Sequence, residues 1–175
     1  MVVSARLRYP ARGAEPGKVD SPRCELPTHC LVAGATVLTT RGDVRAEMLR
    51  VGDALRTRDG HTTPITAVAA RIHQSLSGRM RPIVFKAGSI AHGVPKRNLA
   101  VLPDQPMAKP GPAAAALKPA KELGWRTITQ PLVATHVKFI LLTCRADAVI
   151  SVGGVWAAAC PMAARLEAGG RPAQV

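Results

Sequence analysis

The stretch CLVAGATVLTTRGDVRAEMLRVGDALRTRDG, Cys30 to Gly60, decides the fold. It consists of short apolar runs, each closed by a Gly- and Asp-containing turn signal, RGD at 41–43, VGD at 51–53 and RDG at 58–60. Apolar runs of this length, bounded in this way, are typical of β-strands. Further strand candidates follow at 63–70, 81–88, 98–102, 125–143, 148–152 and 155–159. The spacing predicts an all-β domain of short antiparallel strands.

The composition divides the chain into a body and two tails. Residues 1–29 are rich in Pro, Gly and charge, and predict a disordered leader. The folded domain is expected over 30–160, with a loose tail at 161–175. Inside the domain, 106–121 has the low-complexity sequence PMAKPGPAAAALKPAK, which predicts an inserted loop or a frayed helix.

The chain is strongly basic, with 24 Lys and Arg against 11 Asp and Glu and a net charge of +13. Such a charge attracts nucleic acid or anionic membranes. The basic residues are dispersed, however, and only 3% of the residues are aromatic, so that stacking platforms for bases are scarce. The pattern therefore does not favour a nucleic-acid function.

Nothing in the sequence predicts a signal peptide or a membrane span. The start, MVVSARLRYPARG, has no apolar core of the secretory type. The apolar run at 137–160 carries Arg145 and Asp147 in its middle, which indicates two buried strands. We expect a soluble chain, either cytoplasmic or exported without a cleaved Sec signal.

Four cysteines, Cys24, Cys30, Cys144 and Cys160, lie at irregular spacings without a CxxC pair. They predict neither a zinc ribbon nor a disulfide framework. Cys144 and Cys160 are expected in the core, and we expect no metal ion and no cofactor.

Cys30 stands where the leader meets the first strand. A cysteine can attack the carbonyl of the preceding residue through a five-membered ring, which moves the acyl group from nitrogen to sulfur. This step needs a proton donor for the departing amine, most naturally a histidine. Alternatively, Cys30 is only a small buried apolar residue, as many free cysteines are.

The Cys30–Gly60 stretch resembles the opening block of a Hint domain, the hedgehog/intein autoprocessing fold, in its bacterial branch. The segments RPIVFKAGSIAHGVPKRNLAVLPDQ, 81–105, and THVKFILLTCRADAVISVGGVWAAA, 135–159, are similar to later blocks of that family. The resemblance implies a horseshoe of antiparallel strands with pseudo-twofold halves. It also implies that Cys30 is the nucleophile, that the His29–Cys30 bond is cleaved, and that the chain's own leader is the substrate in cis.

The chain departs from the family where the proton donor should stand. The family's Ser/Thr-Pro-x-His is replaced by Leu102-Pro103-Asp104-Gln105. A glutamine amide donates a hydrogen bond but delivers no proton, and loss of a general acid costs ~10²–10⁴ in rate. The resemblance therefore implies an impaired or inactive module.

Two further family activities lose their residues in this chain. A C-terminal His-Asn pair is missing, which predicts no protein splicing. Ala70 and Arg71 stand where the acid that activates cholesterol in hedgehog proteins would fall, so sterol transfer is unsupported.

Three other residues are candidates for the site. His136 matches the family's strand histidine and is the best remaining proton donor, although a structural role explains it too. Asp147 matches a family acid but equally suits a turn cap. His29 either assists the thiol of Cys30 or is a solvated leader histidine.

Among the remaining polar residues, we expect His61, His73 and His92 to face solvent beside turns, and Asp53 to fix a turn. Two other functions stay open: a non-catalytic structural or binding module of a larger bacterial protein, and a basic nucleic-acid-associated protein.

Overall fold

The computed structural model describes residues 29–74, 76, 78–111, 115–123, 129–131 and 134–161. The expected leader and tail fall almost wholly outside these residues. The described residues form thirteen β-strands and three short 3-10 helices, with no α-helix among them. No helix in this part of the chain has the length and apolarity that a membrane crossing requires. The prediction of an all-β fold is confirmed.

The elements follow one another closely along the chain. The strands are β1 (Leu31–Val32), β2 (Thr36–Thr39), β3 (Gly42–Arg45), β4 (Ala54–Arg56), β5 (Thr62–Gln74), β6 (Ile83–Phe85), β7 (Leu99–Val101), β8 (Pro106–Ala108), β9 (Lys118–Pro119), β10 (Thr129–Pro131), β11 (His136–Cys144), β12 (Ala148–Val152) and β13 (Val155–Cys160). The 3-10 helices are η1 (Ala46–Met48), η2 (Gly78–Met80) and η3 (Ala120–Glu122).

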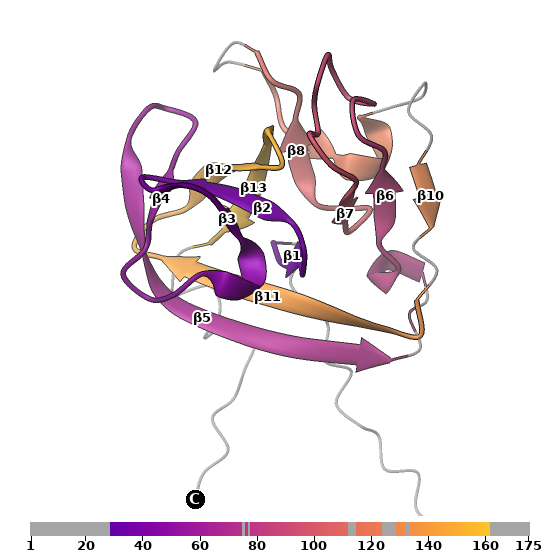
Figure 1. Cartoon of the computed structure of the whole chain (residues 1–175), viewed down its shortest axis with the longest axis horizontal. Helices are drawn as coiled ribbons and strands as arrows, with labels where there is room; N and C mark the ends of the chain where they lie inside the picture. Colours follow the sequence, from indigo (N-terminus) through magenta and orange to yellow (C-terminus); the bar gives the residue numbers. More distant parts are fainter. Residues whose placement is uncertain are drawn as a thin grey trace, which may run out of the picture.

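Ten strands form one curled antiparallel sheet in the order β1-β11-β5-β4-β2-β12-β13-β8-β9, with β3 paired to β2. The long strands β5 and β11 lie side by side beneath the other strands (Figure 1). They run from the group that contains β4 and β12 to the group that contains β6 and β10, and so connect the two sides of the molecule.

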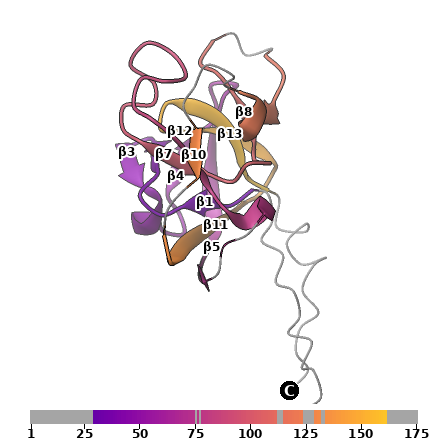
Figure 2. The same ribbon diagram turned by 90° about the vertical axis from the view of Figure 1, so that its right-hand side faces the viewer.

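The other three strands form a separate sheet in the order β10-β6-β7. In Figure 2 this sheet faces the viewer, with β1 and β11 below it. The arrangement is a half-barrel, as expected for the horseshoe of antiparallel strands.

β11 separates the interior into two apolar clusters, because successive side chains of a strand point to opposite faces. Ile140, Leu142 and Cys144 face the main core, which also contains Phe85. Val137 and Phe139 face a smaller cluster. We call this smaller group the Cys30 cluster; its buried members are Cys30, Val32, Leu102, Val137 and Phe139.

Several predicted elements need correction, among them the strand expected at 63–70, because β5 spans Thr62–Gln74. The strand expected within 44–49 ends at Arg45 and continues as η1. The segment 106–121 is not simply a loop, since β8 and β9 pair within it. The backbone N–H of Ala120 also donates to Gln105 O at 2.9 Å. The Pro- and Ala-rich composition gave no sign of these long-range backbone contacts.

Candidate functional site

Cys30 lies directly before β1 and is completely buried, with a free thiol. It packs in the Cys30 cluster, against which the partly buried Leu76, Met80, Ala100 and Leu141 also pack. Burial in these apolar surroundings raises the pKa of the Cys30 thiol from 9.0 to about 12. At neutral pH the group is therefore almost entirely an un-ionised thiol, which is a poor nucleophile.

Strand alternation explains why Leu102 joins Cys30. In β7, Leu99 and Val101 face the main core, so the next residue, Leu102, turns to the other face and enters the Cys30 cluster. Cys30 itself reaches that cluster because Leu31, which pairs with Ile140, faces the main core. The structure therefore places the predicted nucleophile in one cluster with Leu102, one of the two residues predicted to replace a polar family residue.

Gln105, the other predicted replacement, follows Leu102 by one turn and is also completely buried. Its backbone N–H donates to Leu102 O at 3.1 Å. Within the described part of the chain, neither Oε1 nor Nε2 of its side chain has a hydrogen-bond partner. A buried amide without partners is costly, which makes Gln105 an unusual residue at this position.

His29 is fixed to the sheet. Its ring Nδ1 lies 2.6 Å from Ala158 O of β13, and the residue is half-buried. Since a carbonyl oxygen can only accept, Nδ1 is the donor. The alternative of a solvated leader histidine is therefore wrong, and the residue on the other side of the candidate scissile bond is also attached to the folded domain.

The structure does not bring His136 to Cys30. His136 is exposed at the start of β11, opposite Gln74, and its Nδ1 lies 3.2 Å from Thr135 Oγ1. Val137 and Phe139 face the Cys30 cluster, so strand alternation places the neighbouring His136 on the opposite face.

Asp147 also lies elsewhere, in the exposed turn between β11 and β12. There it lines an open cavity of about 460 Å³ together with Asp59, His61 and Arg58 of the segment joining β4 and β5. This cavity contains no member of the Cys30 cluster. In the described part of the chain, no group of three or more His, Cys, Asp and Glu is arranged to hold a metal ion.

His73 was expected in solvent beside a turn, and this expectation is wrong. It lies half-buried on β5 opposite Val137, and its ring meets that of Phe139 edge-on with a centroid distance of 5.7 Å. It thus borders the Cys30 cluster. The predicted strand 63–70 was too short to include it. His61 and His92 are exposed as expected, and Asp53 caps its turn by accepting from Arg50 N at 3.0 Å.

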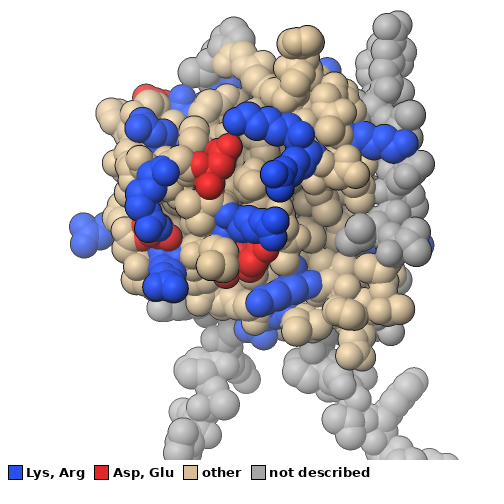
Figure 3. Space-filling model, in the orientation of Figure 1, with Lys and Arg blue, Asp and Glu red and all other residues tan. Residues whose placement is uncertain are grey.

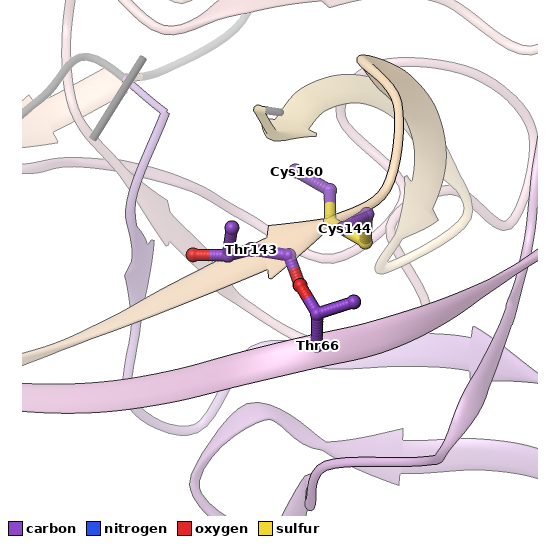
Figure 4. The surroundings of a disulfide bond; sticks show 4 residues. All are labelled: Thr66, Thr143, Cys144 and Cys160. Carbon is purple, nitrogen blue, oxygen red and sulfur yellow. A yellow bond between two sulfur atoms is a disulfide. The ribbon is translucent and has the colours of Figure 1, made fainter. Parts of the chain in front are cut away.

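A disulfide joins Cys144 and Cys160, whose Cα atoms lie 5.8 Å apart. Figure 4 shows this bond linking the end of β11 to the end of β13, with Thr66 of β5 reaching Thr143. The cysteine spacing predicted no disulfide framework and gave no sign of this bond, whereas the expectation that both cysteines lie in the core is confirmed. Their spacing of 16 residues carries no signal, because only the pairing of β12 with β13 brings the two strand ends together.

The basic side chains are dispersed over the surface. On the face shown in Figure 3, Lys and Arg surround isolated Asp and Glu residues. Among the described residues, several basic side chains are ion-paired, including Arg41 with Asp53, Lys121 with Asp104 and Lys96 with Asp43. On this face the positive charge is thus divided among many positions, and the prediction that nucleic acid is not the partner stays a prediction.

A family model described as Hint domain matches residues 29–161. No curated protein matches the chain. Among solved structures, the bacterial intein-like domain from Clostridium thermocellum is 14% identical, with a TM-score of 0.51, and the match covers 74% of this chain and 97% of that one. At this identity the likeness shows the fold alone.

Two inteins are also similar in structure, although less so. The MchDnaB-1 intein (N145AA) has a TM-score of 0.46 at 14% identity and covers 72% of this chain and 97% of its own. The gp41-1 intein has a TM-score of 0.46 at 11% identity and covers 73% and 97%.

Proposed function

Because this chain belongs to the Hint domain family, we propose that it is an autoprocessing module in which Cys30 attacks the carbonyl of His29 and which is impaired at that step. The observation that carries the proposal is the complete burial of Cys30 in one apolar cluster with Leu102, one turn from the buried Gln105. The substrate of the reaction is the leader of the same chain, residues 1–29.

The reaction begins with an acyl shift. Cys30 Sγ bonds to the carbonyl carbon of His29, the C–N bond to Cys30 breaks, and the thiol proton passes to the departing nitrogen, which becomes a free amine. Water or another nucleophile then cleaves the thioester and releases the leader. A normal amide makes this first step uphill, so the site must activate the thiol and protonate the nitrogen.

The surroundings of Cys30 support impairment of thiol activation. With a pKa of about 12, the thiolate fraction near pH 7.5 is lower by ~10³ than for a free cysteine of pKa ~8.5. Leu102, in the same cluster, offers only apolar atoms. A serine or threonine hydroxyl there could hydrogen-bond to the reacting groups.

The surroundings of Gln105 support impairment of proton transfer. Its amide is buried without a partner in the described residues, and it has no proton to deliver at neutral pH. A histidine at this position could carry a proton to the amine nitrogen, so we expect the replacement to cost ~10²–10⁴ in rate.

The test uses the full chain with an affinity tag before Met1. The wild type and the repaired variant Leu102→Ser with Gln105→His are incubated with hydroxylamine, which cleaves thioesters. We expect no fragment from the wild type and, from the repaired variant, a tagged fragment whose mass corresponds to an end at His29.

The matched control is Cys30→Ala in the repaired background, which must abolish the fragment. Cleavage of the wild type at the rate of the repaired chain would contradict impairment. Absence of cleavage in both proteins would contradict autoprocessing and favour a non-catalytic structural module.

A further inference from the structure

His29, the residue before the candidate scissile bond, is attached to a distant strand. His29 Nδ1 donates to Ala158 O at 2.6 Å across 129 residues of sequence. Ala158 lies at an irregularity of β13, because the pairing with β12 shifts register between Ala148↔Cys160 and Val149↔Ala158. Such bulges interrupt a strand ladder and redirect its groups. His29 is thus attached to the bulged end of β13.

The second observation is that the disulfide holds the same end of β13. Cys160 follows Ala158 by two residues and is bonded to Cys144, the last residue of β11. The pairing of β11 with β5 is also irregular there, because Thr66 of β5 is the extra residue between the pairs Thr143↔Ala67 and Cys144↔Ile65, and Thr66 Oγ1 donates to Thr143 O at 3.0 Å (Figure 4). Cys144 N also donates to Pro161 O at 3.2 Å. The ends of β11 and β13 are therefore joined covalently where regular pairing fails.

The third observation is that Cys30 is held by the other of these two strands. β1 pairs with β11 through Leu31↔Ile140 and Val32↔Phe139, and Cys30 packs against the cluster face of β11. The two residues of the junction are thus attached to different strands, His29 to β13 and Cys30 to β11. The disulfide connects those two strands.

We propose that the Cys144–Cys160 disulfide and the His29 imidazole together hold the His29–Cys30 junction closed in the oxidised chain, and that reduction of the disulfide by a thiol opens it. His29 acts as a positioning residue for the His29–Cys30 bond. The inference rests on the proposed function only in taking this junction as the bond to be cleaved.

Opening needs a reductant of the thiol class. A dithiol gives two electrons and two protons to the S–S bond, which becomes two cysteine thiols, while the dithiol closes to its own disulfide. Because Cys144 and Cys160 are both buried, the first attack requires a local opening of the strand ends, and the closed state persists once oxidised.

The readout is the alkylation rate of Cys30 by iodoacetamide, resolved by peptide mass spectrometry so that each cysteine is measured separately. We compare three proteins: the oxidised wild type, the wild type after reduction with dithiothreitol and removal of the reagent, and the double variant that carries both Cys144→Ala and Cys160→Ala. Cys30 is expected to react at least tenfold faster in the second and third proteins. The reduced wild type serves as the test if the double variant does not fold.

The role of His29 is tested with two variants of similar size. His29→Asn keeps an N–H donor near the position of Nδ1 and is expected to retain slow alkylation in the oxidised chain. His29→Leu removes the donor and is expected to react as the reduced chain does. Equal rates for the two variants would overturn the positioning role.

General loss of stability is separated from opening of the junction by its urea dependence. The alkylation rate through a local opening changes little with urea, whereas the alkylation rate through global unfolding rises with the full slope of the unfolding transition. Val44→Ala, which trims a side chain packed on the main core, is the destabilised control and must show the full slope. The inference would be overturned if Cys30 in the reduced chain were alkylated within twofold of its rate in the oxidised chain. It would also be overturned if the alkylation rate of the reduced chain rose with urea along the full slope of the unfolding transition.

Failure of the proposed function is read separately in the repaired variant. If that variant does not cleave while Cys30 protection still depends on the disulfide, autoprocessing is refuted and the closed junction stands. If the repaired variant cleaves while the protection of Cys30 from alkylation is independent of the disulfide, the role of the disulfide at the His29–Cys30 junction is refuted and autoprocessing stands.

Discussion

Removing the disulfide should cost the protein much of its stability. The perturbation is Cys144→Ala with Cys160→Ala. The bond closes a loop with a sequence separation of 16 residues, and chain entropy assigns about 3 kcal/mol to a loop of this length. Both sulfurs lie in the main core, so the lost packing adds to this value. We expect the free energy of unfolding to fall by about 3–4 kcal/mol.

The assay is equilibrium unfolding in urea without reductant, followed by tryptophan fluorescence. Arg145→Ala is the matched control, because Arg145 is exposed beside Cys144 and its removal should change the unfolding free energy by less than ~0.5 kcal/mol. A loss below 1 kcal/mol in the double variant, with the wild type shown to be oxidised by a thiol count, would refute the reasoning. It would mean that the strand ends stay together without the covalent bond.

Three further substitutions or conditions test the surroundings of the site. Folding raises the pKa of Cys30 from 9.0 to about 12, so the stabilisation by the un-ionised thiol is fully present below pH 9 and is lost as the pH rises toward 12. Relative to Cys30→Ala, the free energy of unfolding of the wild type should fall by about 1.4 kcal/mol per pH unit in this window. Urea unfolding at pH 8 to 10.5 measures this difference, and a difference that stays constant would contradict the buried thiol. Gln105→Met replaces an unpartnered buried amide and should raise the unfolding free energy by ~1–2 kcal/mol, whereas a lower midpoint in urea would show that the amide is hydrogen-bonded. Thr66→Val removes the donor to Thr143 O and should cost about 1 kcal/mol in the same assay, with an unchanged midpoint as the contrary result.

Much of the fold is readable from local sequence. Turn signals and apolar runs predict the strands around β2, β4, β7 and β12, because each run must bury one face and each Gly-Asp turn must end it. The burial of Leu99 and Val101, with Leu102 on the other face, follows from the same alternation. The extension of β5 to Gln74 was not readable, because it depends on pairing with β11, which lies far along the chain. The bounds of β3 and the pairing of β8 with β9 were not readable either, although their partners are close in the sequence.

The candidate site divides in the same way. The sequence, through its resemblance to the family, predicts Cys30 as the nucleophile and Leu102 and Gln105 as replacements of two polar residues, since both are local patterns in the chain. Only the tertiary structure decided that Cys30 is buried beside Leu102, that His29 is bonded to β13, and that Cys144 meets Cys160. The physical reason is register, because the way in which strands pair, whether they are neighbours in sequence as β12 and β13 are or far apart as β1 and β11 are, determines which side chains become neighbours. No local pattern in the chain records that register.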